Sequence, residues 1–522
     1  MSLPAPTPYD LVPYPSYTHV QTHPGQLATV ATMFGMTPTP VERCRVLEVG
    51  CGDGSNLIPM ACALPDSDFT GIDLAAQPIA QAQEMAAGLG LKNLRIVRDN
   101  ITAIGPDWGR FDYIIAHGFY SWVPAEAREH LLAICRQNLA PQGVAFVSYN
   151  AYPGQHAARM LREMMLFHVR GFASPTERIH QAQALLRFLA EAHTGADEYS
   201  QLLRAEIEHQ REREDNHLYH DDLAEINEPF YFTQFMDHAQ RHGLQYLGEA
   251  GFFEALDWGF PPAVRQTLAQ LGPNRILREQ YSDFLKCRRF RQTLLCHQDV
   301  SLQLELRPEQ VPAFLVSSST RPATGQADLA PRVPVRFQTP KGLKAETDFA
   351  LGKAALLLLG EIWPRPLPFD ELLAQAHARL RDAGLPQDAT PETRAVFCQF
   401  LLQTYGTGVL AFHCHAPACA ARAGARPDAF PPARWRVQHG HDSAPTAFHH
   451  TVQLEDEIGR QLLLLLDGTR DRAALVDELV RFLKSKNALA QAGQDEAQAR
   501  QRVADELEKN LAALARLGLL VA

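Results

Sequence analysis

The feature that most constrains the fold is a glycine-rich turn after a short apolar run. Residues 45–49 predict a buried strand, and residues 55–63 predict a helix. Between them Gly50, Gly52 and Gly54 alternate, so the backbone can approach a ligand closely while the helix start offers free N–H groups. This GxGxG spacing differs from the GxGxxG of dinucleotide-binding proteins and from the P-loop. A tight strand-to-helix turn that binds nothing is the alternative.

Acidic residues accompany this turn and end the next two predicted strands. Glu48 lies two residues before the first glycine, and residues 69–73 form a short strand that ends in Asp73. An acid about 20 residues past such a turn binds the ribose hydroxyls in nucleoside-binding folds, although Asp73 could instead cap the following helix. The strand at 94–98 ends at Asp99, which can accept the adenine amino group. These ends meet at the carboxyl edge of an α/β sheet, where ligands bind.

The loop after the fourth predicted strand provides candidate catalytic residues. That strand covers residues 111–116 and is followed by His117, Tyr120 and Trp122. Aromatic faces can hold a lysine ammonium by cation–π contact, which makes the loop a candidate acceptor site. Packing in the core is an open alternative for Trp122.

Residues 1–40 are rich in proline and aromatic residues. Because prolines lower the entropy that a segment loses on docking, the composition favours an ordered lid. We expect Tyr9, Tyr14, Tyr17, His19 or His23 to close over the bound ligand and to shape the pocket beside it. The alternative is a structural arm that covers the sheet edge.

Together these motifs resemble the class I S-adenosylmethionine-dependent methyltransferases over residues 40–150. The string from residue 9 to residue 35, before the glycine turn, is similar to bacterial methyltransferases with a methyltransferase regulatory domain. That group includes rickettsial protein-lysine methyltransferases that act on outer-membrane protein B. The resemblance implies an α/β fold with a Rossmann-like seven-stranded sheet and S-adenosyl-L-methionine as cofactor. The implied cofactor-binding residues are Glu48, Gly50, Cys51, Gly52, Gly54, Asp73, Leu74, Asp99, Asn100, Ile101 and His117.

The sheet is expected to be interrupted by a helical insertion. Residues 155–228 have helical patterns and suit a regulatory or dimerisation role, whereas residues 229–300 would return to the sheet as its sixth strand and an antiparallel seventh. Residues near these junctions are the remaining predicted substrate-pocket residues: Tyr149, Asn150, Tyr152 and Tyr231.

The C-terminal half contains an internal repeat. Residues 350–361 align without a gap with residues 457–468, and the match continues into a second helix. Helix, helix, helix and strand is a winged-helix outline, so we expect tandem winged-helix-like α+β domains. Acidic residues on each second helix disfavour DNA binding. The predicted domains are 1–40 (arm), 41–154 (cofactor-binding core), 155–228 (insertion), 229–300 (sheet return), 301–432 (middle domain with the first repeat) and 433–522 (second repeat).

Two clusters hold metal-ligating residue types. Residues 216–222 are rich in His and Asp, but helix capping explains them more simply. Residues 413–419 contain two His and two Cys but lack a second CxxC pair. We therefore predict no metal site.

Composition bounds the function. The chain has 522 residues, a net charge of −10 and nine scattered cysteines, with no apolar run of 18 residues. It is long enough for several domains, and we expect no export signal, a cytoplasmic location, no membrane partner and no nucleic-acid partner. The predicted function is a methyltransferase acting on a protein side chain, with lysine favoured and a surface or outer-membrane precursor or a homodimer among its partners. The alternatives are a small-molecule or RNA methyltransferase, and a cofactor-binding protein without transfer activity.

Overall fold

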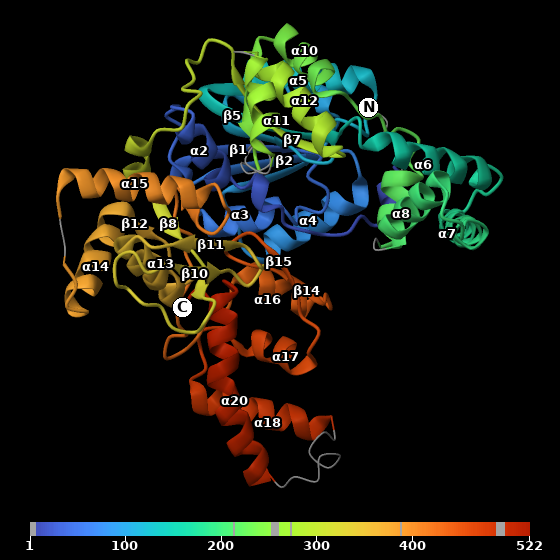
Figure 1. Cartoon of the computed structure of the whole chain (residues 1–522). Helices are drawn as coiled ribbons and strands as arrows, with labels where there is room; N and C mark the ends of the chain where they lie inside the picture. Colours follow the sequence, from blue (N-terminus) through green and yellow to red (C-terminus); the bar gives the residue numbers. More distant parts are fainter. Residues whose placement is uncertain (1–6, 212–213, 252–259, 272–273, 387–388, 487–495) are drawn as a thin grey trace.

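The computed structural model describes residues 7–211, 214–251, 260–271, 274–386, 389–486 and 496–522. Its centre is a seven-stranded sheet in the order β3-β2-β1-β4-β5-β7-β6, in which only β7 runs antiparallel to its neighbours (Figure 1). This confirms the predicted class I methyltransferase sheet. The strands are β1 (Arg45–Val49), β2 (Asp68–Asp73), β3 (Leu94–Arg98), β4 (Phe111–Ala116), β5 (Leu139–Asn150), β6 (Leu244–Glu249) and β7 (Phe290–His297).

Helices cover both faces of the sheet, because its central strands are apolar on both sides. The helices α5 (Ala125–Asn138) and α10 (Phe232–Arg241) enclose one core with side chains such as Leu131 and Phe235. The helices α2 (Pro24–Met33) and α3 (Leu57–Ala63) enclose the other core. The remaining helices of this domain are α1 (Pro8–Leu11), α4 (Ala76–Gly88), α11 (Pro262–Gln270) and α12 (Arg275–Lys286).

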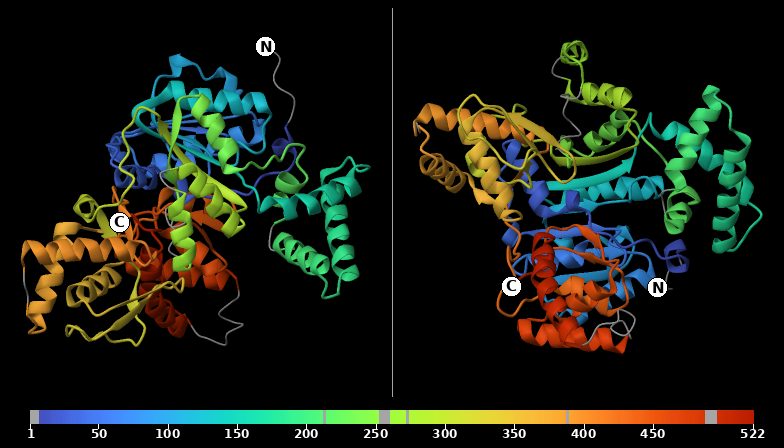
Figure 2. Two further views of the ribbon diagram at one scale, coloured as in Figure 1. Left: turned by 45° about the horizontal axis from the view of Figure 1, so that its top comes forward. Right: turned by 60° about the horizontal axis from the view of Figure 1, so that its bottom comes forward.

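The predicted insertion forms a separate helical unit at one side of the sheet (Figures 1 and 2). It has its own core, in which Leu161, Ile179 and Leu203 pack together with Val12 of the N-terminal arm. Its helices are α6 (Gln155–Val169), α7 (Pro175–Ala192), α8 (Glu198–Arg211) and α9 (Asp215–His217), followed by a single turn at Leu218–Asp222.

The first repeat follows the sheet. Residues 300–307 form no strand: Gln303 N–H donates to Phe34 O, and Leu302 and Leu306 pack on the core beside α2. The helical turn η8 (Pro308–Ala313) leads into this region. Its elements are β8 (Leu315–Ser317), β9 (Arg321–Pro322), β10 (Val335–Gln338), β11 (Lys344–Thr347), α13 (Ala350–Ile362), β12 (Leu367–Pro368), α14 (Phe369–Asp382), α15 (Pro391–Tyr405) and β13 (Ala411–His413).

The second repeat ends the chain and lies below the sheet in Figure 1. It repeats the order of three helices and a short C-terminal strand pairing, here the bridge between Ala429 and Leu520. Its elements are α16 (Pro431–Gln438), β14 (Ser443–Pro445), β15 (Thr451–Gln453), α17 (Glu457–Leu465), α18 (Arg472–Ser485) and α20 (Glu496–Arg516). Among the described residues, no helix is both long and apolar enough to cross a membrane.

Candidate active site

A cavity of about 1360 Å³ lies at the carboxyl edge of the sheet. The ends of β1, β2, β3 and β4 form its floor, and the N-terminal arm and the helical insertion form its sides. Helix α16 of the second repeat closes a further side with Trp435 and Arg436. Four separate regions of the sequence therefore build one site.

The glycine turn is bent as the sequence requires. Gly50, Gly52 and Gly54 all have positive φ, at 74°, 53° and 72°. A Cβ on Gly52 would point into open space, whereas a Cβ on Gly54 would lie 2.8 Å from the Ile58 side chain. Gly50 and Gly52 line the cavity and Gly54 does not, so Gly54 serves helix packing instead of a ligand.

Asp73 anchors the glycine turn and faces the cavity, and its role toward a ribose stays a prediction. Its carboxylate accepts from Gly52 N–H at 3.0 Å and from Ala75 N–H at 2.9 Å, so it ties the glycine turn to the start of α4. It also lines the cavity. The anchored carboxylate therefore stands at the position where a ribose would bind.

The surroundings of Glu48 show whether the site suits the cofactor. Its Oε1 accepts from Asn56 Nδ2 at 2.6 Å, but Oε2 is buried on the cavity wall without a hydrogen-bond partner. Burial raises the pKa of Glu48 to about 8. Because an unpartnered buried carboxylate oxygen is costly, a ligand ammonium there would satisfy it, as the methionine amino group of the cofactor would. The site thus fits S-adenosylmethionine.

The other predicted cofactor-binding residues also line the cavity. Asp99 Oδ1 accepts from Asn100 N–H at 2.7 Å, and Asn100 Oδ1 accepts from Thr102 N–H at 3.0 Å, which fixes the turn after β3. Predicted residues on this wall are Cys51, Leu74, Asp99, Asn100, Ile101 and His117. Their roles toward the cofactor remain predictions.

Of the three catalytic candidates, His117 and Trp122 line the cavity and Tyr120 does not. His117 is half-buried, its ring lies 4.0 Å from that of His19, and desolvation holds its pKa well below the usual value. The Trp122 indole N–H is buried without a hydrogen-bond partner. The Tyr120 side chain turns into the core and its hydroxyl bonds to His238 Nδ1 at 2.6 Å.

The predicted pocket residues divide in the same way. Tyr14, Tyr17 and Asn150 line the cavity. Tyr149 is instead buried in the core against Phe235, because alternate residues of β5 face opposite sides of the sheet. The other misplaced residues are His23, which caps α2 through Gly25 N–H, and Tyr152 and Tyr231, which pack on His156 outside the cavity.

The arm crosses from the sheet to the insertion. The Tyr9 ring lines the cavity and stacks on His220 at 4.4 Å, and His220 Nε2–H donates to Val12 O at 2.7 Å. Tyr14 OH donates to Asp221 at 3.4 Å. The arm is therefore an ordered wall of the cavity.

The second repeat supplies residues that no sequence signal indicated. Its cavity residues are Trp435, Arg436, His439 and His441. Arg436 Nη1 donates to Ser55 Oγ at 3.3 Å, and His449 Nε2–H donates to Asn56 Oδ1 at 2.8 Å. Asn56 thus joins Glu48 on the floor to the C-terminal domain across almost 400 residues of sequence.

The two clusters considered for metal binding are not assembled as such. His220 is held by the arm, and His413, Cys414 and His415 bond separately to Ser317, Thr32 and Glu42. Within the described ranges, one other group brings three potential ligand residues together: Glu129, His238 and His242. Its members are 109 and 113 residues apart, and the His-x₃-His spacing of its two histidines was the available signal.

Comparison with known proteins agrees with this architecture. Residues 46–143 match the family described as methyltransferase domain, 214–297 match the predicted methyltransferase regulatory domain, and 425–519 match the PKMT C-terminal winged helix domain. The regulatory match thus spans the end of the insertion and the returning strands.

The matches to individual relatives cover from 46% to 98% of the chain. Uncharacterized protein RP789 of Rickettsia prowazekii is 36% identical over 385 residues, which cover 72% of this chain and 69% of that protein. Uncharacterized protein RP028 of the same organism is 35% identical over 46% of this chain and 96% of its own length. The structure of PKMT2 from Rickettsia typhi in complex with AdoHcy is similar with a TM-score of 0.87 and 27% identity, over 98% of this chain and 100% of that chain. The chain therefore belongs to the family of S-adenosylmethionine-dependent methyltransferases that join a methyltransferase domain, a methyltransferase regulatory domain and a PKMT-type winged helix.

Proposed function

We propose that this methyltransferase acts on a protein and transfers the methyl group to a lysine side chain. The observation that carries the proposal is the acidity of the cavity wall, whose described residues include eight acidic ones and two arginines, Arg289 and Arg436. The acidic residues are Glu48, Asp53, Asp73, Glu84, Asp99, Glu126, Asp221 and Asp222. An acidic cleft attracts a cationic substrate and repels phosphate backbones.

The build of the cavity supports a macromolecular substrate. A pocket for a small ligand has a volume of roughly 300–1,000 Å³, whereas this cavity measures about 1360 Å³. Its wall extends from the sheet to the insertion and to α16. A cofactor and a lysine side chain together suit such a volume. The likeness to PKMT2 over nearly the whole chain supports the same substrate class.

The transfer forms a bond from the lysine nitrogen to the methyl carbon and breaks the bond from that carbon to the cofactor sulfur. The nitrogen must first lose a proton to water, and both desolvation in the cavity and the sulfonium charge of a bound cofactor would promote this loss. The low pKa of His117 makes it a weak proton acceptor, so we assign it to positioning of the acceptor. Trp122 would provide an aromatic face with an N–H that can bind the substrate backbone.

Transfer of a labelled methyl group in a cell lysate tests the proposal. Label in protein that is released as methyl-lysine on hydrolysis is the expected result. Label in RNA or in small molecules would show that the substrate is not a protein. Cofactor binding without any transfer would show that the chain is a regulatory protein and not an enzyme.

Two substitutions on the wall sharpen the test. Glu126→Gln and Asp221→Asn should raise the KM for the protein substrate severalfold while the affinity for AdoHcy stays the same. Glu163→Gln is the matched control, because Glu163 is an exposed acid on α6 away from the cavity. An unchanged KM in both wall variants would contradict electrostatic recognition of the acceptor.

We further propose a homodimer in the reducing cytoplasm. Large apolar side chains are exposed on the insertion, with Phe167 and Phe188 about two-thirds accessible at 65% and 64%, and Tyr199 and Leu202 are also exposed. Exposed apolar side chains of this size suit contact with a second copy. All nine cysteines are free, as in reducing compartments. Light scattering of wild type and Phe188→Asp would test the dimer, and a monomeric wild type would contradict it.

A further inference from the structure

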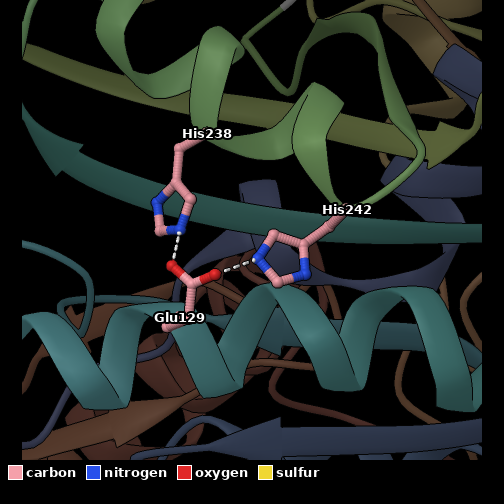
Figure 3. A group of neighbouring side chains, drawn as sticks. All are labelled: Glu129, His238 and His242. Carbon is pink, nitrogen blue, oxygen red and sulfur yellow. Dashed lines mark hydrogen bonds and ion pairs between the residues drawn. The ribbon is translucent and has the colours of Figure 1, made fainter.

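Two histidines and a glutamate converge on the outer surface of the catalytic domain, away from the cavity (Figure 3). His238 lies on α10, and His242 follows at the end of the same helix. Residues four apart share one face of a helix, so both imidazoles point toward α5, where Glu129 points back at them. None of the three side chains lines the active-site cavity.

The ligand atoms are close enough to share one ion. His238 Nε2 lies 2.6 Å from Glu129 Oε2, and His242 Nε2 lies 2.9 Å from Oε1. The donor atoms of all three residues lie within 4.8 Å of one another. Ligands at about 2.0–2.2 Å from a tetrahedral zinc ion are about 3.3 Å apart, so a small withdrawal of the carboxylate opens the required space.

An outer hydrogen bond orients one of the imidazoles. His238 Nδ1 is bonded to the buried hydroxyl of Tyr120 at 2.6 Å. Metal-binding histidines almost always use their second ring nitrogen in this way, since the bond fixes the ring orientation and the tautomer. An adventitious surface pair of histidines would not require such a partner from the core.

We propose that Glu129, His238 and His242 form a binding site for a divalent transition-metal ion of the zinc type. The imidazole nitrogens select zinc-like ions over Ca²⁺ and Mg²⁺, which prefer sets of oxygen ligands. Three protein ligands leave a fourth position for water, which the exposed side of Glu129 can admit.

The ion would connect two parts of the catalytic domain. Glu129 belongs to the segment that matches the methyltransferase domain, and both histidines belong to the regulatory segment. Through Tyr120 the site also contacts the loop that places Phe119 and Trp122 on the cavity wall. Metal binding should therefore stabilise the packing of α10 on α5 and hold this loop.

The test uses the full chain without a histidine tag, stripped with a chelator and titrated with Zn²⁺ by calorimetry. Co²⁺ serves as a second probe, because its visible spectrum reports coordination geometry. We expect one tight ion per chain and a higher melting temperature with Zn²⁺. Loss of an outer partner of a metal ligand weakens binding by about 10–100-fold, so Tyr120→Phe should cost about tenfold and loss of a ligand should cost more.

Glu129→Gln and His242→Ala are the ligand variants, and Glu129→Gln keeps the size and shape of the side chain. His180→Ala is the matched control, because it removes an exposed helical histidine from α7 outside the cluster. It should bind Zn²⁺ as the wild type does. A wild type that takes up no ion, or ligand variants that bind and gain thermal stability as the wild type does, would overturn the proposal.

Discussion

The C-terminal half contains the repeated segments 350–413 and 457–520, of which the second forms one domain with the preceding α16, β14 and β15. The two segments have the same order of three helices and a short strand pairing but different neighbours. In the first repeat, Leu351, Leu359 and Phe412 belong to the same hydrophobic core as the sheet and α2. In the second repeat, Leu463 and Leu511 belong to a core of its own that only touches the edge of α3. One repeat is thus built into the catalytic domain and the other is attached to it.

The repeats share their internal bonds. Lys353 and Arg460 occupy matching positions, and each binds main-chain carbonyls of the preceding segment. Asp370 pairs with Arg394 at 2.6 Å, and Asp477 of the second copy likewise pairs with Arg500. These acids connect the second and third helices, which gives them a structural role.

The different neighbours of the two repeats show that the same helical unit can have two functions, depending on what it contacts. The first repeat supports the back of the sheet, and none of its described residues lines the cavity wall. The second domain places α16 on the wall and bonds to Ser55 and Asn56 beneath it. We expect the first repeat to control stability and the second to control binding.

Truncation should separate these tasks most strongly. A chain that ends at residue 416 keeps the shared core, so it should fold but bind AdoHcy at least about tenfold more weakly, a loss of about 1.4 kcal/mol. A chain that ends at residue 299 exposes the apolar surface under the first repeat and should lose cooperative unfolding. Thermal melting and calorimetry measure both effects. Equal stability of the two shortened chains would contradict the view that the first repeat controls the stability of the catalytic domain.

Core substitutions give the next largest effect. Leu359→Ala and Leu466→Ala each remove a fully buried leucine, which costs about 2–5 kcal/mol. The Leu359 variant should lower the unfolding transition of the catalytic domain. The Leu466 variant should lower only that of the second repeat. Hydrogen exchange resolved along the chain distinguishes these results, and a uniform loss of protection in both variants would mean that the repeats form one unit.

The basic residues at matching positions of the two repeats, Lys353 and Arg460, should show a smaller difference in their contributions to stability. Lys353 is fully buried and its Nζ donates to Asp328 O, Ala330 O and Val333 O at 2.7, 2.6 and 2.9 Å. Lys353→Met leaves these carbonyls without the ammonium and should cost about 1–3 kcal/mol. Arg460→Met should cost less, since water reaches the half-buried Arg460. Urea unfolding measures both values, and a larger cost at Arg460 would reverse the expected order.

The smallest effect concerns pH. Burial lowers the pKa of His449 well below 6.5 in the folded chain, so the unfolded chain alone takes up a proton as pH falls below 6.5. Stability is therefore full above pH 6.5 and is lost toward acid. One such histidine costs about 1 kcal/mol between pH 6.5 and 5.5. In the His449→Gln variant, the attachment of the second repeat should no longer lose this stability as the pH falls.

His413→Gln is the control for this experiment. Burial also lowers the pKa of His413, to about 4, but this residue lies in the first repeat. The His413→Gln substitution should change only the pH dependence of the unfolding transition of the catalytic domain and the first repeat. Limited proteolysis near residues 417–424 at both pH values reports release of the second repeat, and an unchanged pH dependence in the His449 variant would contradict a titrating attachment.

Local patterns predicted the strands and their ends well. The apolar run before Gly50 and the acids Asp73 and Asp99 lie where the sheet pattern placed them, because each depends on residues adjacent in sequence. Aromatic loop residues were harder. Tyr120 and Trp122 are two residues apart, yet one enters the core and the other the cavity, since packing of α10 on α5 decides which side is filled.

The sequence by itself determined the seven-stranded sheet, the glycine turn with its acids and the internal repeat, since these depend on local periodicity and on fixed spacings. Only the tertiary structure decided that Trp435 and Arg436 join the cavity wall, that the arm crosses to the insertion and that Glu129 meets two histidines. Those contacts join residues more than 100 positions apart. They form where burial of apolar surface outweighs the entropy of closing long loops, a balance that depends on the whole packed chain.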